Sequence, residues 1–93
     1  MRYIMIDALT AAKTSYIGVT DKATVVSTGL GSNESIAINI LVGTTYVPLI
    51  DNEVAVTLTS VKPHIILSGE SNYQFVKGVT SSAVTLEVIG NIE

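Results

Sequence analysis

The stretch SNYQFVKGVTSSAVTLEV, residues 71–88, decides the fold because it contains two runs in which side chains of different polarity alternate. Successive side chains of a β-strand point to opposite faces, so this period of two predicts two strands that each bury one face. The first run has Tyr73, Phe75 and Lys77 on one face, and the second alternates Val84, Leu86 and Val88 with Thr85 and Glu87. Between the runs, the small residues at 78–82 predict a turn that reverses the chain.

The same alternation continues upstream and sets the fold class. Residues 35–42 place Ile36, Ile38, Ile40 and Val42 on one face, and a turn at 43–45 leads into a short run that contains Pro48. Proline cannot donate a hydrogen bond to a ladder, so Pro48 is predicted to mark an edge strand or the end of a strand. Further strands are predicted at 54–58 and 64–68, with a turn at 69–72. Five or six short strands indicate an all-β protein, either a small antiparallel β-sandwich or a jelly-roll-like barrel.

The first third of the chain has a different texture, although the length fits one domain overall. Residues 1–33 are rich in small side chains and alternate weakly, whereas residues 34–93 carry the predicted sandwich core. Turn-forming residues at 29–33 predict a loop. Two interpretations of the first 33 residues are open: strands at 2–6 and 23–27, or an arm that orders only against a neighbouring chain. The segment 7–13 has room for one or two helical turns.

Composition excludes several classes of protein. Hydrophobic residues make up 47% of the chain and charged residues 14%, against about 25% in typical soluble domains, so a partner is expected to cover part of the surface. The net charge is −3 and the five basic residues are scattered, which argues against nucleic-acid binding. No apolar run is long enough to cross a membrane, and Asp7 interrupts any signal-peptide core. Without cysteine there is no disulfide or thiolate metal site.

Candidate chemistry is sparse, and we predict neither an enzyme nor a bound cofactor or metal. His64 is the only histidine and has no partner of the kind that a catalytic triad needs. Asp51 and Glu53 flank Asn52 and offer oxygen ligands for calcium, but a solvated turn explains them better. The glycines at 29 and 31 precede a predicted strand, whereas a dinucleotide-binding loop precedes a helix. The tyrosines are interpreted as core or interface residues in preference to a sugar-stacking platform.

Three stretches carry a resemblance to a known class of protein: ESIAINILVGTTYVPL, DNEVAVTLTS and SGESNYQFVKGVTSSAVTLEV. Together they resemble small structural proteins of tailed-bacteriophage virions. The resemblance implies a non-enzymatic β-sandwich that is made in the host cytoplasm and resides on the capsid surface of the virion. It further implies a head decoration or cement protein that binds the major capsid protein or other virion subunits. By analogy, the protein is expected to form a homo-oligomer, with a trimer as the first expectation.

Two alternative functions stay open, and six contact residues are predicted. One alternative is a tail or head-to-tail connector component, and the other is a carbohydrate-binding or adhesive β-sandwich. Apolar and aromatic side chains in the weakly patterned first third, and on the outer side of the strand at 35–42 and its neighbour, suit contacts with other subunits. The predicted contact residues are Tyr3, Ile4, Ile6, Tyr16, Leu41 and Tyr46.

Overall fold

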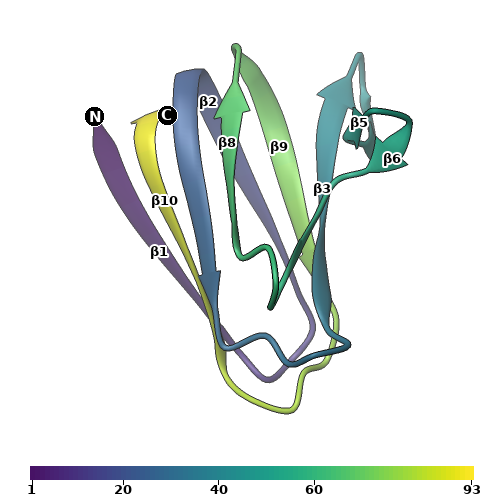
Figure 1. The fold of residues 1–93 in the computed structure, drawn as a ribbon. Helices are drawn as coiled ribbons and strands as arrows, with labels where there is room; N and C mark the ends of the chain where they lie inside the picture. Colours follow the sequence, from purple (N-terminus) through teal and green to yellow (C-terminus); the bar gives the residue numbers. More distant parts are fainter.

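The protein is built from β-strands and turns and has no helix, which confirms the predicted all-β class (Figure 1). A computed structural model describes all residues from Met1 to Glu93. The strands are β1 (Arg2–Leu9), β2 (Lys13–Thr28), β3 (Ser35–Val42), β4 (Thr45–Pro48), β5 (Ile50–Asp51), β6 (Val54–Ala55), β7 (Thr57–Thr59), β8 (His64–Ser68), β9 (Ser71–Lys77) and β10 (Val84–Ile92).

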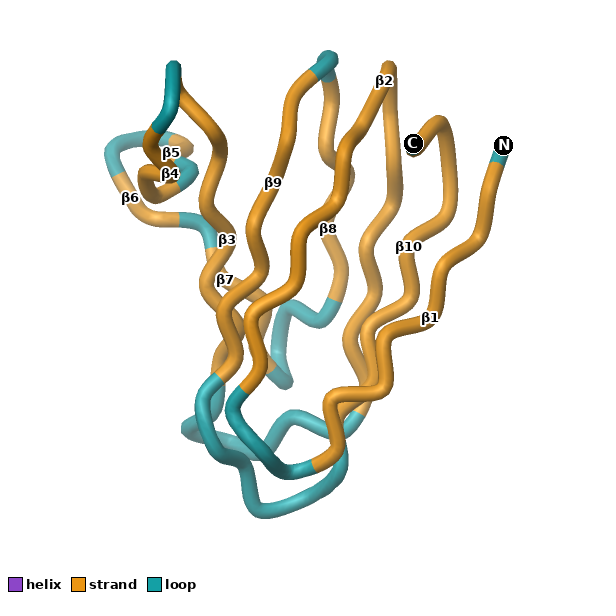
Figure 2. The backbone as a smooth tube through the Cα atoms, turned by 180° about the vertical axis from the view of Figure 1, so that it is seen from behind, coloured by secondary structure: helices purple, strands orange, loops and turns teal.

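The long strand β2 creates two layers because its halves pair with different neighbours. Its first half pairs with β9, and its second half pairs with β10 on one side and β8 on the other. Figures 1 and 2 show β2 doubling back at one end of the molecule. Layer 1 therefore consists of β1, β10, the second half of β2, and β8. Layer 2 consists of the first half of β2, β9 and β3, with β4 and β7 beside β3. This is a small antiparallel β-sandwich.

Strands β8 and β9 follow β2 around the same bend. The register runs without a break from Lys13 opposite Lys77 to Val26 opposite His64. At the bend, the Gly69 N–H donates to the Asp21 carbonyl over 2.7 Å. Gly69 has a φ of 94°, a backbone conformation that glycine adopts without steric cost. The predicted turn at 69–72 is thus a bend that carries one ladder from layer 1 to layer 2.

Two segments are arranged differently from what their sequence pattern alone suggests. Residues 78–82 do connect two strands, but β9 and β10 do not pair, because β9 lies between β2 and β3 while β10 lies between β1 and β2. The predicted single strand at 54–58 is interrupted. Its first residues form β6, which pairs with β5 in a separate small sheet, whereas β7 pairs with β3.

The first 33 residues contribute β1 and β2 to the sandwich, so the strand alternative describes them and the arm does not. β1 pairs with β10 from Arg2 to Leu9, so residues 7–9 belong to a strand. A short turn then leads into β2 at Lys13. The expectation of helical turns at 7–13 is wrong because Ala8 continues the inward face of β1 and is buried. The boundary at residue 33 falls in the loop before β3.

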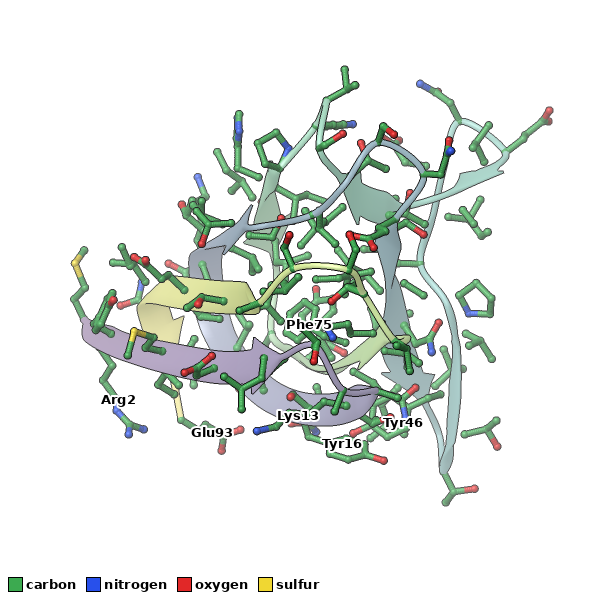
Figure 3. All side chains as sticks on the ribbon, turned by 90° about the horizontal axis from the view of Figure 1, so that it is seen from below. Arg2, Lys13, Tyr16, Tyr46, Phe75 and Glu93 are labelled. Carbon is green, nitrogen blue, oxygen red and sulfur yellow. The ribbon has the colours of Figure 1, made fainter.

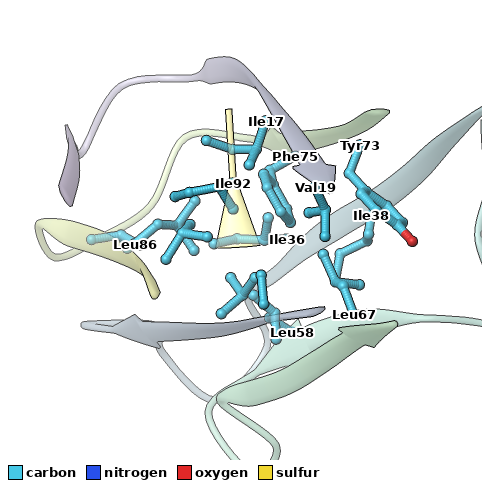
Figure 4. Packing of buried hydrophobic residues seen from close by; sticks show 14 residues of the cluster. Ile17, Val19, Ile36, Ile38, Leu58, Leu67, Tyr73, Phe75, Leu86 and Ile92 are labelled. Carbon is cyan, nitrogen blue, oxygen red and sulfur yellow. The ribbon is translucent and has the colours of Figure 1, made fainter. Parts of the chain in front are cut away.

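The core lies between the two layers (Figure 4). Most side chains predicted to face inward are buried there, whereas Ile40 is half-buried and Val42 is exposed, because β3 runs past the end of the core. Lys77 is also buried, and its ammonium donates to the carbonyls of Ala11 at 2.6 Å and Gly78 at 3.0 Å. The core cluster consists of Ile17, Val19, Ala23, Val25, Ile36, Ile38, Leu58, Leu67, Tyr73, Phe75, Val84, Leu86, Val88 and Ile92.

Candidate functional site

Exposed apolar side chains gather on the outer face of layer 1. The strand registers place Tyr3 beside Ile89, Ile89 beside Thr24, and Thr24 beside Ile66, which forms one row across all four strands. Side chains directly opposite each other in an antiparallel pair share a face and lie within contact distance. Tyr3 is 56% exposed, Ile66 58% and Ile89 38%, so the row is largely open to solvent.

A second row runs beside the first and extends the apolar surface. It places Met5 beside Glu87, Glu87 beside Val26, and Val26 beside His64. Met5 is 59% exposed. We call the surface formed by Tyr3, Met5, Val26, Ile66 and Ile89 the apolar face. The only ionisable side chains in the second row are Glu87 near its centre and His64 at its end. An exposed apolar patch that spans four strands is a common mark of a protein–protein contact.

Tyr3 brings a polar group to the apolar face. Partial desolvation raises the pKa of Tyr3, and the nearby Glu87 carboxylate raises it further through hydrogen bonding and charge. The hydroxyl therefore stays protonated at neutral pH and can donate a hydrogen bond. The Glu87 carboxylate is an acceptor for this hydroxyl within the chain, and a ring with an apolar body and a polar tip suits an interface.

The outer face of layer 2 carries a second group, which we call the tyrosine cluster: Tyr16, Asn39, Leu41, Tyr46 and Gln74. The rings of Tyr16 and Tyr46 have centroids 5.4 Å apart and are tilted by 58°. Figure 3 shows both rings outside the layer, whereas Phe75 lies between the layers. Two hydrogen bonds fix the amides, from Asn39 Nδ2 to Gln74 Oε1 at 2.6 Å and from Gln74 Nε2 to the Tyr16 hydroxyl at 3.3 Å.

The six predicted contact residues fall into three places. Tyr3 lies on the apolar face. Ile4 and Ile6, on the other side of β1, pack against the core and so contribute to the fold of this chain. Tyr16, Leu41 and Tyr46 come together in the tyrosine cluster, where Leu41 and Tyr46 are directly opposite each other.

Sequence reasoning missed most of the apolar face. Met5, Ile66 and Ile89 were not predicted as contact residues, although each lies between residues that face inward. The available signal was that these strands have apolar side chains on both faces, as in IMI at 4–6 and IIL at 65–67. A strand that faces solvent on one side normally alternates apolar and polar residues.

The structure offers few groups for metal or acid–base chemistry. It contains no group of three or more His, Cys, Asp or Glu side chains that could hold a metal ion. Asp51 and Glu53 lie at the turn of the β5–β6 hairpin, and His64 is exposed at the start of β8. No helix is present that could cross a membrane.

Glu34 ties together two loops at the end of the sandwich opposite the bend. Its carboxylate accepts hydrogen bonds from the backbone N–H of Gly31 at 2.6 Å and of Ser81 at 2.7 Å. The bond from Gly31, then the one from Ser81, and more weakly the charge of Lys77 lower the pKa of Glu34. The ionised carboxylate therefore connects the loop before β3 to the loop before β10.

Acidification is expected to release this connection. A lowered pKa in the folded state means that Glu34 stabilises the fold above its ordinary pKa of 4.5, and this stability is lost as the pH falls below that value. Urea unfolding from pH 7 to pH 3 should show a steeper acid loss for the wild type than for Glu34→Gln, so their difference should shrink toward pH 3. Parallel pH profiles would show that the Glu34 carboxylate has no such role.

No protein-family model, curated protein or solved structure matches this chain.

Proposed function

We propose that this protein is a non-enzymatic structural subunit of a tailed-bacteriophage virion, and specifically a decoration protein that binds between capsid subunits and stabilises the head. The observation that carries the proposal is the apolar face, with Tyr3, Met5 and Ile66 each more than half exposed in the single chain. The resemblance of residues 34–88 to small virion proteins is the reason for proposing that the particle is a phage virion. The partner is then the major capsid protein or another virion subunit.

The shape of the apolar face suits an architectural role. It is formed by side chains of four paired strands, whose backbone positions are fixed by the β1–β10, β10–β2 and β2–β8 ladders. A preorganised surface loses little conformational freedom on binding, so most of the free energy of apolar burial is available as affinity. Stable interfaces bury about 800 Å² on each partner, which is the contact area expected for the proposed interface.

The oligomer belongs to the same proposal. A decoration protein that sits between capsid subunits occupies a symmetric position, and closed symmetric oligomers are the common form of such subunits. We therefore propose a homo-trimer. A tail or head-to-tail connector component would use the same apolar face in a ring, and imaging of labelled protein on intact particles separates that location from the head.

A co-sedimentation experiment tests the contact surface. We expect the purified protein to sediment with capsids of its phage that lack it, and Met5→Lys to weaken this binding at least about tenfold because it places a charge in a desolvated contact. Tyr16→Lys is the matched control, since Tyr16 is equally exposed but lies on the opposite layer. Light scattering measures the oligomeric state of each variant.

The outcomes separate the possibilities. If Tyr16→Lys abolishes binding and Met5→Lys does not, the tyrosine cluster is the contact surface and the assignment to the apolar face is wrong. A wild-type protein that stays monomeric and never sediments with capsids would overturn the decoration function itself.

A second candidate function rests on the tyrosine cluster. Tyr16 is 60% exposed and lies beside the amides of Gln74 and Asn39, so an aromatic face and hydrogen-bonding groups are close together. This combination is favourable for a carbohydrate, although the tilt between the two rings leaves no flat platform. Saturable binding on a glycan array that is lost in Tyr16→Ala would favour an adhesive module over a decoration protein.

A further inference from the structure

A cleft of about 310 Å³ opens beside β8, between this strand and the chain segment that leads through β5 to β7. Its apolar wall is formed by Leu49, Ile50, Val56, Ile65, Leu67 and Tyr73. The cleft lies at the side of the sandwich opposite β1, where no strand joins the two layers. Lys62 and Asp51 lie at its rim and carry opposite charges.

Tyr73 lines the cleft and has a hydroxyl that forms no hydrogen bond within the chain. The residue is only 3% exposed and its ring belongs to the core cluster. Figure 4 shows the hydroxyl pointing away from the other core side chains. Burial raises the pKa of Tyr73, so the hydroxyl is protonated at neutral pH and has a proton to donate. Because no buried side-chain polar atom of the chain lacks a partner, this hydroxyl oxygen is reachable from the cleft, where it can donate to a group of another molecule.

The wall of the cleft formed by β8 also has an unpaired backbone edge. β8 pairs with β2 on one side only. The Pro63 carbonyl accepts from Ser27 N–H and the Gly69 N–H donates to the Asp21 carbonyl, so odd-numbered residues direct their backbone groups toward β2. In an antiparallel ladder the alternate residues point the other way. The backbone N–H and C=O groups of His64, Ile66 and Ser68 therefore face away from β2, along the cleft.

We propose that this cleft binds an extended segment of another protein, which adds to β8 as a further strand of layer 1. The segment's backbone would pair with His64, Ile66 and Ser68, and its inward side chains would enter the cleft. Those side chains are aliphatic where they meet Leu49 and Val56. One of them carries a hydroxyl or carbonyl oxygen that accepts the hydrogen bond from Tyr73. This inference concerns a surface other than the tyrosine cluster and does not depend on the proposed virion function.

The other occupants fit less well. A small ligand would leave the three backbone positions of β8 unpaired, whereas an extended segment pairs them and fills the cleft together. A second copy of β8 could pair along the same edge, but its inward residues Ile65 and Leu67 carry no acceptor for Tyr73. Unpaired strand edges are the usual site at which a foreign strand is added.

The test uses a synthetic peptide of alternating valine and threonine with a lysine at each end, titrated into the full chain. One central valine is replaced by threonine, so that the valine face also carries one hydroxyl. Binding should slow hydrogen exchange at the Ile66 and Ser68 amides at least about tenfold, because these N–H groups become hydrogen-bonded. The same peptide methylated on its central backbone nitrogens keeps its side chains but loses its donors, and should bind at least about tenfold more weakly. The protein is unchanged in this comparison, so folding does not affect it.

Substitutions at two positions separately test the hydrogen bond from Tyr73 and the backbone pairing along β8. Tyr73→Phe removes the hydroxyl alone and should weaken the peptide about fivefold. Ile66→Pro removes a donor that faces the cleft but none that pairs with β2, and should abolish binding, whereas Ile66→Ala should retain it. Absence of binding up to about 1 mM peptide would overturn the inference. So would equal binding of the methylated peptide, or protection of the same amides that rises with protein concentration alone, which would place a second copy on this edge.

Discussion

Replacing Phe75 with alanine is expected to lower the free energy of unfolding by about 3–5 kcal/mol, the usual cost of removing a buried aromatic side chain. Phe75 is 1% exposed and is the largest of the fully buried side chains. Its strand β9 lies between β2 and β3, so the ring packs on the inner side of layer 2, near the middle of that layer. Small domains have a total stability of roughly 5–15 kcal/mol, so this single change removes a large part of it. Urea unfolding monitored by circular dichroism measures the loss.

The neighbouring residue supplies the control for Phe75. Val76 points to the outer face of layer 2 and is only half-buried, so Val76→Ala should cost much less. Phe75→Leu keeps most of the apolar volume and should fall between the two. Equal losses for Phe75→Ala and Val76→Ala would mean that the core does not lie between the layers as described.

Replacing Gly90 with alanine is expected to destabilise the protein by about 3 kcal/mol or more. Gly90 has a φ of 148°, in a region that residues with a side chain rarely adopt. A Cβ atom there would overlap the Lys22 carbonyl oxygen and lie 2.8 Å from the Ala23 Cα. Both are backbone atoms of the adjacent strand β2 and cannot move aside. Gly90 is also where the β10–β2 register shifts before Ile92.

Two other glycines separate the contributions at Gly90. Gly69 has a φ of 94° but open space around it, so Gly69→Ala should cost only the conformational strain of about 1–2 kcal/mol. Gly78 has neither a positive φ nor a close neighbour, so Gly78→Ala should change stability by less than about 0.5 kcal/mol. Thermal unfolding of the three variants should therefore rank them 90, 69, 78. A Gly90→Ala variant no less stable than Gly69→Ala would contradict the close approach of β10 to β2.

The candidate sites were predictable only in part. Tyr16, Leu41 and Tyr46 were predicted as contact residues, and the structure brings them together across layer 2. Of the apolar face only Tyr3 was predicted, since Tyr3 meets Ile89 through a pairing between the two ends of the chain. Nor does any pattern in the sequence indicate that the Tyr73 hydroxyl points into a cleft. Such sites are formed by residues far apart in sequence, and local alternation carries no information about them.

The alternation of side chains is enough to predict most of the strands and the buried face of the regular ones, although not the break within residues 54–58. Phe75, Val84, Leu86 and Val88 face the core as their alternation predicts, because a side chain's face follows from the period of two alone. Which strands are neighbours depends instead on how the whole chain packs. β9 and β10 are joined by a short connection yet do not pair, since the bend in β2 sends its two halves into different layers and each takes a different partner. Strand order depends on packing between distant segments, and that packing placed the apolar face on layer 1 and the free edge at β8.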